Sequence, residues 1–348
     1  MNALVLAGCI LLDAPYKHDF GTVPAALDDG WVVATPEEVG LDPAELDDIH
    51  EELLAQDQYF GTLAVLIVKD GKLVFEAYLR DPADRDHVHH LQSATKSVSA
   101  MLAGISQDRG RLPPVQTPAC DLLGEACDGL GEQKQAITIE HLLSMRSGLD
   151  LSNEFMAYEL TVKPPADPLR FLLELPLLGD PGEVFEYRDV DPQVMAYVLA
   201  VAEGQSEEAF AQDHLFAPLG IEDWYWLDLH DGATTGAFGL HLRPRDLARL
   251  GQVALDGGAW QGTQVVPEAW LLSAIAPLEA DAWEGWSYGW YFWTSPEGDA
   301  HTMAGHGGQF AMWFPAADLL AVQVAMPDAE LHGSAPGDFY GLVRRLAD

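Results

Sequence analysis

Basic residues are scarce in this sequence. Lys and Arg number 18 against 55 Asp and Glu, which gives a formal net charge of −37 at pH 7 over 348 residues. Nucleic-acid binding requires a basic surface, so this balance excludes a nucleic acid as partner. The acidic residues are scattered along the chain, which indicates a strongly solvated surface. Such a surface suits a salty environment and predicts a melting temperature that rises with salt.

Long apolar runs are missing as well. No run reaches the roughly 18 residues that a membrane-spanning helix needs, although 48% of the residues are hydrophobic. A chain of 348 residues can bury a large core, so we expect a soluble, globular protein. No period of about 20 to 50 residues is visible, which excludes solenoids and propellers.

Cysteine occurs at three positions. Cys9 ends the run Leu6-Ala7-Gly8-Cys9, which resembles the lipobox where bacterial lipoproteins are cleaved and acylated. No basic residue precedes it, and its apolar run is short for a signal peptide. Either the true start lies upstream and Cys9 carries a lipid anchor, or the match is accidental.

The other two cysteines are close together in the sequence. The spacing of Cys120 and Cys127 permits a disulfide in an oxidising compartment, and two buried free thiols are the alternative. Together with Cys9, the pair favours export, as a periplasmic protein or a membrane-anchored lipoprotein, over a cytoplasmic location.

The order of predicted elements indicates one compound domain. Residues 1–30 lack periodicity and are predicted to be a leader or tether, followed by a single catalytic domain at 31–348. Asp70-Gly71 between two β-rich runs predicts a hairpin. The predicted strands are 62–68, 72–78, 287–293, 309–314 and 319–326, and the predicted helices begin near 35, 93, 137, 169, 192, 245 and 338.

These elements predict an α/β (α+β) fold. An antiparallel sheet of about five strands is flanked by helices, and a long helical insertion separates its two sequence halves. We assign an α/β lobe to about 35–92 and 235–348 and an α-rich lobe to about 93–234.

The stretch from His90 to Leu102 carries the main chemical signal. If Ser93 opens a helix, Lys96 shares its first turn, since residues three apart are neighbours on a helix surface. The partial positive charge of a helix N-terminus disfavours a protonated lysine and favours an oxyanion nearby. A neutral Lys96 amine could then take the Ser93 proton and make Ser93 an acyl-accepting nucleophile.

A plainer interpretation of the same stretch is an N-cap serine followed by an exposed lysine. The apolar residues Val98, Met101 and Leu102 follow at helical spacing, so the helix is predicted to be buried. A lysine in the first turn of a buried helix needs a reason to be there.

Two further stretches offer the groups that a serine-lysine site needs. Tyr187, in a loop before a predicted helix, is a candidate proton-handling group, although a core aromatic is the alternative. Glycines in Gly305-His306-Gly307-Gly308-Gln309, at the start of a predicted strand, allow a close approach of helix and substrate. The backbone amides of Ser93 and Gln309 could then point at one carbonyl oxygen.

Ser93-x-x-Lys96, Tyr187-x-Asp189 and His306-Gly307-Gly308, in this order, resemble the three motifs of the serine β-lactamase and penicillin-binding protein superfamily. The chain is most similar to its class C branch, with the β-lactamase-related esterases and aminohexanoate-dimer hydrolases. The resemblance covers about residues 35–345 and implies a β-lactamase/transpeptidase-like fold.

The resemblance also implies roles for the motif residues. Ser93 is acylated, Lys96 and Tyr187 share the base and acid work, and the amides of Ser93 and Gln309 form the oxyanion hole. The resemblance assigns the substrate contacts to Asp189, His306, Gly307 and Gly308. No cofactor is implied.

Two positions depart from the family pattern. Asp189 stands where asparagine is common, and an ionised carboxylate accepts hydrogen bonds but cannot donate them. His306 stands where lysine is common, and a neutral imidazole holds a substrate carboxylate less well than an ammonium does. The departure at Asp189 puts the family's usual amide contact to substrate in doubt, and the departure at His306 makes efficient β-lactam hydrolysis a weaker expectation.

The sequence therefore predicts a serine hydrolase acting on a small-molecule or peptide-like ester or amide. A DD-peptidase or β-lactamase is the first alternative, and a non-catalytic penicillin-binding-like recognition protein is the second. Metal hydrolysis is a remote third, because His87, His89 and His90 have no second ligand cluster. Aromatic residues between Trp283 and Trp293 either line an acyl pocket or pack in the core.

Overall fold

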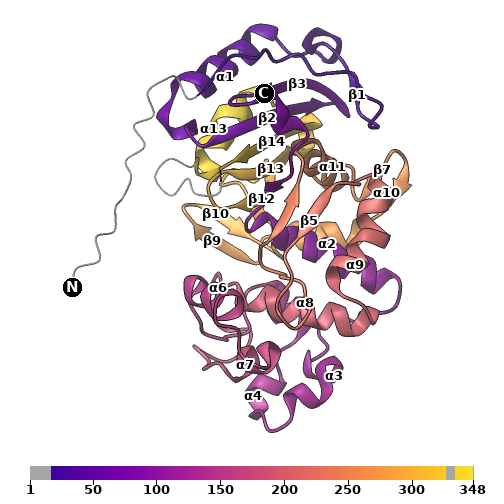
Figure 1. Cartoon of the computed structure of the whole chain (residues 1–348), viewed down its shortest axis with the longest axis vertical. Helices are drawn as coiled ribbons and strands as arrows, with labels where there is room; N and C mark the ends of the chain where they lie inside the picture. The colour runs from indigo at the N-terminus through magenta and orange to yellow at the C-terminus, as the bar shows by residue number, and fades with distance from the viewer. Residues whose placement is uncertain (1–16, 327–333, 348) are drawn as a thin grey trace, which may run out of the picture.

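The structure is a computed structural model that describes residues 17–326 and 334–347 (Figure 1). Its centre is a nine-stranded sheet in which neighbouring strands are antiparallel, except that β1 runs parallel to β3. From edge to edge the strands are β1 (Val32–Val33), β3 (Lys72–Tyr78), β2 (Thr62–Lys69), β14 (Leu319–Ala325), β13 (Gln309–Phe314), β12 (His301–Gly305), β11 (Trp293–Thr294), β10 (Trp286–Tyr288) and β9 (Glu279–Trp283).

The early hairpin forms as predicted. Asp70 and Gly71 have φ values of 52° and 68°, the left-handed conformation that a tight turn between twisted strands requires. Successive side chains of β2 pack into two different cores, Leu66 on one face of the sheet and Ile67 on the other. The strand is therefore a continuous apolar run, because both faces of the sheet are covered.

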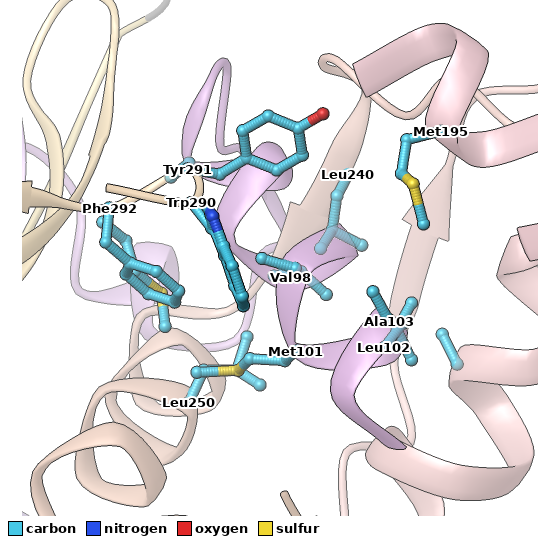
Figure 2. Packing of buried hydrophobic residues seen from close by; sticks show 14 of the residues in the cluster. Val98, Met101, Leu102, Ala103, Met195, Leu240, Leu250, Trp290, Tyr291 and Phe292 are labelled. Atoms are coloured by element: carbon cyan, nitrogen blue, oxygen red, sulfur yellow. The ribbon is translucent and has the colours of Figure 1, made fainter. Parts of the chain in front are cut away.

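The predicted strand 287–293 is wrong, because a turn divides it into β10 and β11. Gly289 N donates to Phe292 O at 2.9 Å across this turn, and Tyr291 has a φ of 63°. At Gly289 an added Cβ would lie 2.2 Å from Ala274 O, so only glycine fits. The turn directs Trp290 into the core beside α2 (Figure 2). Composition alone cannot distinguish such a turn from a strand.

Helices cover both faces of the sheet (Figure 1). The core that contains Ile67 holds side chains of α1 (Pro43–Ala55) and α13 (Pro336–Val343), and the core that contains Leu66 holds those of α2 (Ala94–Asp108) and α11 (Pro244–Leu255). A smaller sheet has the order β4 (His89–His90), β6 (Leu240–Leu242) and β5 (Trp224–Trp226), and a two-stranded sheet joins β7 (Ala259–Trp260) to β8 (Thr263–Gln264).

The helical insertion follows α2 in the chain. Its helices are α3 (Cys120–Leu123), α4 (Glu132–Gln135), α5 (Ile139–Leu143), α6 (Asn153–Thr161), α7 (Pro168–Glu174), α8 (Val190–Glu203), α9 (Glu207–Ala211) and α10 (Ala217–Leu219), and α12 (Glu268–Ile275) follows later. Of these helices, α3, α4, α6, α7 and α8 lie below α2 in Figure 1. A π-helical turn, η5, spans Gln212–Phe216, and 3₁₀ turns span Pro36–Val39, Asp57–Tyr59, Pro82–Arg85, Gly124–Cys127, Pro315–Ala317 and Arg344–Leu346.

The predicted antiparallel sheet with flanking helices and an α-rich insertion is confirmed, with more strands than the predicted five and one parallel pair. The division into lobes at 35–92, 93–234 and 235–348 stays a prediction.

Residues 17–30, which the sequence assigns to a leader or tether, lie along β3. His18 N donates to Leu79 O at 2.8 Å, and Glu76 N donates to Thr22 O at 2.9 Å. The buried Arg245 of α11 pairs with Asp29 at 2.7 Å and with Glu76. This part of the predicted leader is therefore integrated into the fold, whereas Cys9 lies outside the described residues.

Cys120 and Cys127 form a disulfide, which their spacing permits, so the alternative of two free thiols is wrong. Within residues 17–326 and 334–347, no helix is both long and apolar enough to cross a bilayer.

Candidate active site

The first turn of α2 carries Ser93 and Lys96. Gln92 takes a left-handed backbone conformation with φ of 52°, and Ser93 is the N-cap of the helix, as predicted. The small sheet fixes this turn, since Leu91 N donates to Leu240 O at 2.8 Å. The Ser93 hydroxyl does not cap the helix, so it is available to the lysine one turn on.

Lys96 is buried, and its amine reaches back to the serine. Its Nζ donates to Ser93 Oγ at 2.7 Å and to Ala237 O at 2.9 Å. Only 1% of the residue is exposed, so these acceptors and a nearby carboxylate replace its water shell. The interpretation as an exposed lysine after an N-cap serine is therefore wrong.

Asp189 supplies that carboxylate. Its Oδ1 lies 2.7 Å from Lys96 Nζ and is otherwise buried without a hydrogen-bond partner, so the lysine charge compensates it. Burial acts to lower the pKa of Lys96, but the Asp189 carboxylate and then Tyr187 act in the opposite direction, and the net pKa is raised. The free site therefore holds an ammonium at pH 7, and the prediction of a neutral Lys96 amine is wrong.

The position of Asp189 also explains why the sequence misjudged the lysine. Asp189 is the N-cap of α8, and α8 packs against α2, so the pair forms by tertiary packing across 93 residues. The structure directs the Asp189 carboxylate at Lys96, and Asp189 is not among the residues that line the cavity described below.

Tyr187 joins the cluster two residues before Asp189. Its ring centroid is 5.1 Å from Lys96 Nζ, and a hydrogen bond to Tyr187 helps to raise the lysine pKa. The ring packs against Tyr288 and Trp293, with centroids 5.7 and 5.6 Å away. These aromatic contacts hold the phenol beside the lysine.

Ser93 and Tyr187 face a common cavity of about 520 Å³. Most of its wall is apolar or aromatic. The lining residues are Ser93, Tyr187, Ala282, Trp283, Trp293, Ala304, Gly305, His306, Gly307, Phe310, Ser334, Ala335 and Pro336. The two interpretations of the aromatic stretch are therefore both correct in part, because Trp283 and Trp293 line the cavity while Trp290 packs in the core.

The third motif forms the turn between β12 and β13. His306 and Gly307 line the cavity, and His306 is exposed to solvent. Gly308 has φ of 104°, and an added Cβ would lie 2.5 Å from Gln323 Nε2 and 2.9 Å from Ser334 Oγ. Gly308 therefore supports the turn from behind rather than forming part of the cavity wall.

Gln309 is fully buried in β13, and its side chain anchors the neighbouring strand. Its amide nitrogen donates to Ala325 O at 2.8 Å, and its amide oxygen accepts from Ala325 N at 3.1 Å. Gln323 donates to Gly308 O at 3.0 Å in the same way. Sequence reasoning missed Gln323, Ser334 and Ala237, since no motif or spacing connects them to Ser93.

The three early histidines do not form a metal site. His89 Nε2 contacts Asp84 O at 3.0 Å, and the His90 ring stacks on His241 with centroids 4.7 Å apart. In the part of the chain that the structure describes, no group of three or more His, Cys, Asp or Glu could hold a metal ion.

Comparisons with known proteins agree with this geometry. The family model described as Beta-lactamase matches residues 46–327. The 6-aminohexanoate-dimer hydrolase of Paenarthrobacter ureafaciens is 26% identical over 232 residues, which make up 62% of this chain and 57% of that protein. The chain thus matches little more than half the length of this curated relative.

Two solved structures share the fold. The octameric penicillin-binding protein homologue from Pyrococcus abyssi has a TM-score of 0.69 at 18% identity, over 88% of this chain and 78% of that one. A family VIII carboxylesterase also has a TM-score of 0.69, at 14% identity, over 90% of this chain and 98% of that one. Because the family model matches most of the sequence, the chain belongs to the beta-lactamase family, a family of hydrolases.

Proposed function

We propose that the protein is a serine hydrolase that cleaves an ester or amide bond through a covalent acyl-enzyme on Ser93. The observation that carries the proposal is the 2.7 Å contact from Lys96 Nζ to Ser93 Oγ at the wall of the cavity. A serine nucleophile needs such a neighbour, and the N-terminus of α2 favours negative charge on its oxygen. Membership of a hydrolase family supports this assignment.

In this mechanism Lys96 and Tyr187 share the proton transfers. The Lys96 ammonium stabilises the Ser93 alkoxide, and Tyr187 acts as the base that accepts the serine proton. The alkoxide forms a bond to the carbonyl carbon, and when the tetrahedral intermediate collapses, the leaving group takes the proton from Tyr187. Water then attacks the acyl carbon and gives a proton to Tyr187, and this proton returns to Ser93 as the acid is released.

The carbonyl oxygen needs two donors while it carries negative charge. We assign these donors to the backbone amides of Ser93 and Gln309. Gln309 suits this role because its side chain is fixed to β14 at 2.8 and 3.1 Å, so its backbone cannot drift.

The cavity wall favours an uncharged, apolar acyl group. Its residues are mainly Trp, Phe, Ala and Pro, and none of the described residues that line it is Lys or Arg. A substrate carboxylate would therefore meet no lysine or arginine side chain in this lining. This supports an ester or amide of an apolar acid over a β-lactam or a peptide with a terminal carboxylate.

A panel of four substrates tests the proposal on wild type and Ser93→Ala. We expect p-nitrophenyl esters and linear amides to be hydrolysed, and expect Ser93→Ala to lose at least about 10³-fold in kcat/KM. Faster hydrolysis of a chromogenic cephalosporin or a D-amino-acid peptide would favour the β-lactamase or DD-peptidase alternative. No turnover of any substrate, with no labelling of Ser93 by a fluorophosphonate, would favour a recognition protein.

We also propose that the protein is exported. The Cys120–Cys127 disulfide supports this, because structural disulfides persist in oxidising compartments. Alkylation of the unfolded protein from its native host, before and after reduction, should show two additional reactive thiols after reduction. Equal labelling before and after reduction would contradict export.

A further inference from the structure

A second carboxyl group is buried behind the Ser93–Lys96 pair. Glu207 is the first residue of α9 and is 1% exposed. Both of its carboxyl oxygens are buried without a hydrogen-bond partner of normal geometry. A buried carboxyl group without such partners is costly, so it needs a structural or functional explanation.

The group that interacts with Glu207 is the hydroxyl of Ser99, one turn after Lys96 on α2. Burial raises the pKa of Glu207 to about 7, and the Ser99 hydroxyl acts in the opposite direction. The same hydroxyl donates to Gly236 O at 3.2 Å. A hydroxyl has one proton, so Ser99 cannot donate to Glu207 and to Gly236 at once.

The Gly236 peptide leads directly to the catalytic lysine. Ala237, the next residue, accepts from Lys96 Nζ at 2.9 Å. Gly236 is pressed against α8, where an added Cβ would lie 2.3 Å from Pro192 O, and its N–H donates to Gln193 at 3.3 Å. The segment is therefore held by α8 on one side and by Ser99 on the other.

We propose that Glu207 is a positioning residue for the serine-lysine site. In its neutral form it donates to Ser99, whose own proton then holds Gly236 and keeps the Ala237 carbonyl against Lys96. In its ionised form it draws the Ser99 proton to itself, and the contact with Gly236 is lost. This inference rests on the proposed function.

Other charged groups around Glu207 are engaged elsewhere. Arg109, at the end of α2, lies 3.8 Å from Glu203 at the end of α8 and 3.4 Å from His214 of η5. Glu203 also accepts a hydrogen bond from Ser106 of α2 at 2.6 Å. At the start of α8, Asp191 accepts from Ser147, and Asp189 pairs with Lys96.

Two more titratable groups belong to this neighbourhood. Tyr291, whose pKa is raised by burial and by Asp191 and Glu207, donates to Leu142 O at 2.9 Å. Glu208 of α9, whose pKa burial and Asp228 raise to about 7, is engaged with that aspartate. Among the described residues, no cation contributes to the pKa of Glu207. Ser99 is therefore the group whose hydrogen bonds change when Glu207 ionises.

The test is the rate of Ser93 labelling by a fluorophosphonate from pH 5.5 to 8.5, on the full chain. We expect the wild-type rate constant to fall at least about threefold as the pH rises through about 7. Glu207→Gln donates to Ser99 at every pH, so its rate should stay within about twofold of the wild-type value at low pH. In Ser99→Ala, labelling of Ser93 should be slow at every pH, and the rate constant should not fall as the pH rises through about 7. This fall near pH 7 is called the step below.

Glu208→Gln is the matched control, because it removes a neighbouring carboxyl group with a similar pKa that does not contact Ser99. It should keep the wild-type step. The same step in Glu207→Gln or in Ser99→Ala would overturn this inference alone. Absence of labelling in the wild type would overturn the proposed function and this inference with it, and a failure of Glu207→Gln to fold leaves Ser99→Ala to decide.

Discussion

Asp189 sets the charge of the site at the scale of single residues. A carboxylate 2.7 Å from a buried lysine keeps the amine protonated, where burial alone would favour the neutral form. A serine-lysine pair can use the lysine either as a base or as a fixed positive charge. In the proposed mechanism Asp189 selects the fixed positive charge, and Tyr187 is assigned the role of the base.

Asp189→Asn tests that assignment. Removing the carboxylate leaves burial as the dominant effect, so the pKa of Lys96 should fall. A neutral Lys96 no longer stabilises the Ser93 alkoxide, so labelling of Ser93 in Asp189→Asn should slow at a lower pH than in wild type, in addition to the step assigned to Glu207. Asp150→Asn, which removes a carboxylate 3.1 Å from the more exposed Arg188, should leave the pH profile of labelling unchanged. An unchanged profile in Asp189→Asn would show that Asp189 does not control the lysine.

Reasoning from the residues alone accounts for the contacts of the site that are local in the chain, whereas the distant motifs are identified by the family resemblance. Ser93 and Lys96 are three apart on a helix, so their contact follows from helix geometry. The Lys96–Asp189 pair depends on how α8 packs against α2, and the Ala237 carbonyl on a loop pressed between them. Neither relation leaves a periodic or compositional signal, so the charge of Lys96 could not be predicted.

At the scale of elements, the loop between β5 and β6 packs tightly against α8. Gly236→Ala would place a Cβ 2.3 Å from Pro192 O, so the loop must shift away from α8 and take the Ala237 carbonyl with it. We expect a loss of about 1–3 kcal/mol in unfolding free energy and slower labelling of Ser93.

Gly131→Ala is the control for this substitution, because no atom lies within 4 Å of its added Cβ. Its stability and labelling rate should remain close to wild type. Equal behaviour of the two variants would show that the loop is not constrained as the contacts indicate. Both can be compared by urea unfolding and by the labelling assay.

The pairing of β4 with β6 should weaken in acid. His90 Nε2 accepts from Gly239 N at 3.1 Å, and burial, with a smaller effect of His241, lowers the pKa of His90 to about 4. An unfolded histidine binds a proton below about pH 6.5. The unfolded state therefore binds more protons between pH 6.5 and 4, and stability falls as the pH drops through this range.

His90→Gln isolates this contribution. It keeps an acceptor for Gly239 N but cannot titrate, so its stability relative to wild type should improve by about 2 kcal/mol from pH 7 to pH 4.5. Urea unfolding at the two pH values measures the change. His230→Gln, at an exposed position, should show no such improvement, and a pH-independent difference for His90→Gln would contradict the assignment.

At the scale of the whole molecule, the charge of −37 opposes folding through self-repulsion. Salt screens this repulsion over about 10 Å at 0.1 M and about 3 Å at 1 M. We expect the melting temperature to rise by several degrees between about 0.05 and 1 M sodium chloride. A flat or falling melting temperature would show that the acidic surface is compensated locally.

The molecule as a whole was predictable at the level of layers and less so at the level of strands. The residue types of Asp70 and Gly71 predict the hairpin turn, and the helical spacing of apolar residues after Ser93 predicts the helix. The break at Gly289–Phe292 is imposed by Ala274 of α12, so an aromatic run that is typical of a strand becomes a turn. Nothing local to that run distinguishes the two outcomes.

The central claim is that Ser93 becomes acylated, and the mass of the intact protein tests it most directly. Wild type and Ser93→Ala are mixed with a p-nitrophenyl ester and quenched in acid within the first turnover. The mass of each intact protein is then measured by mass spectrometry. We predict that wild type gains the mass of one acyl group, that peptide mapping places this group on Ser93, and that Ser93→Ala gains none. An equal adduct on both proteins, or no adduct on wild type during active turnover, would contradict the account.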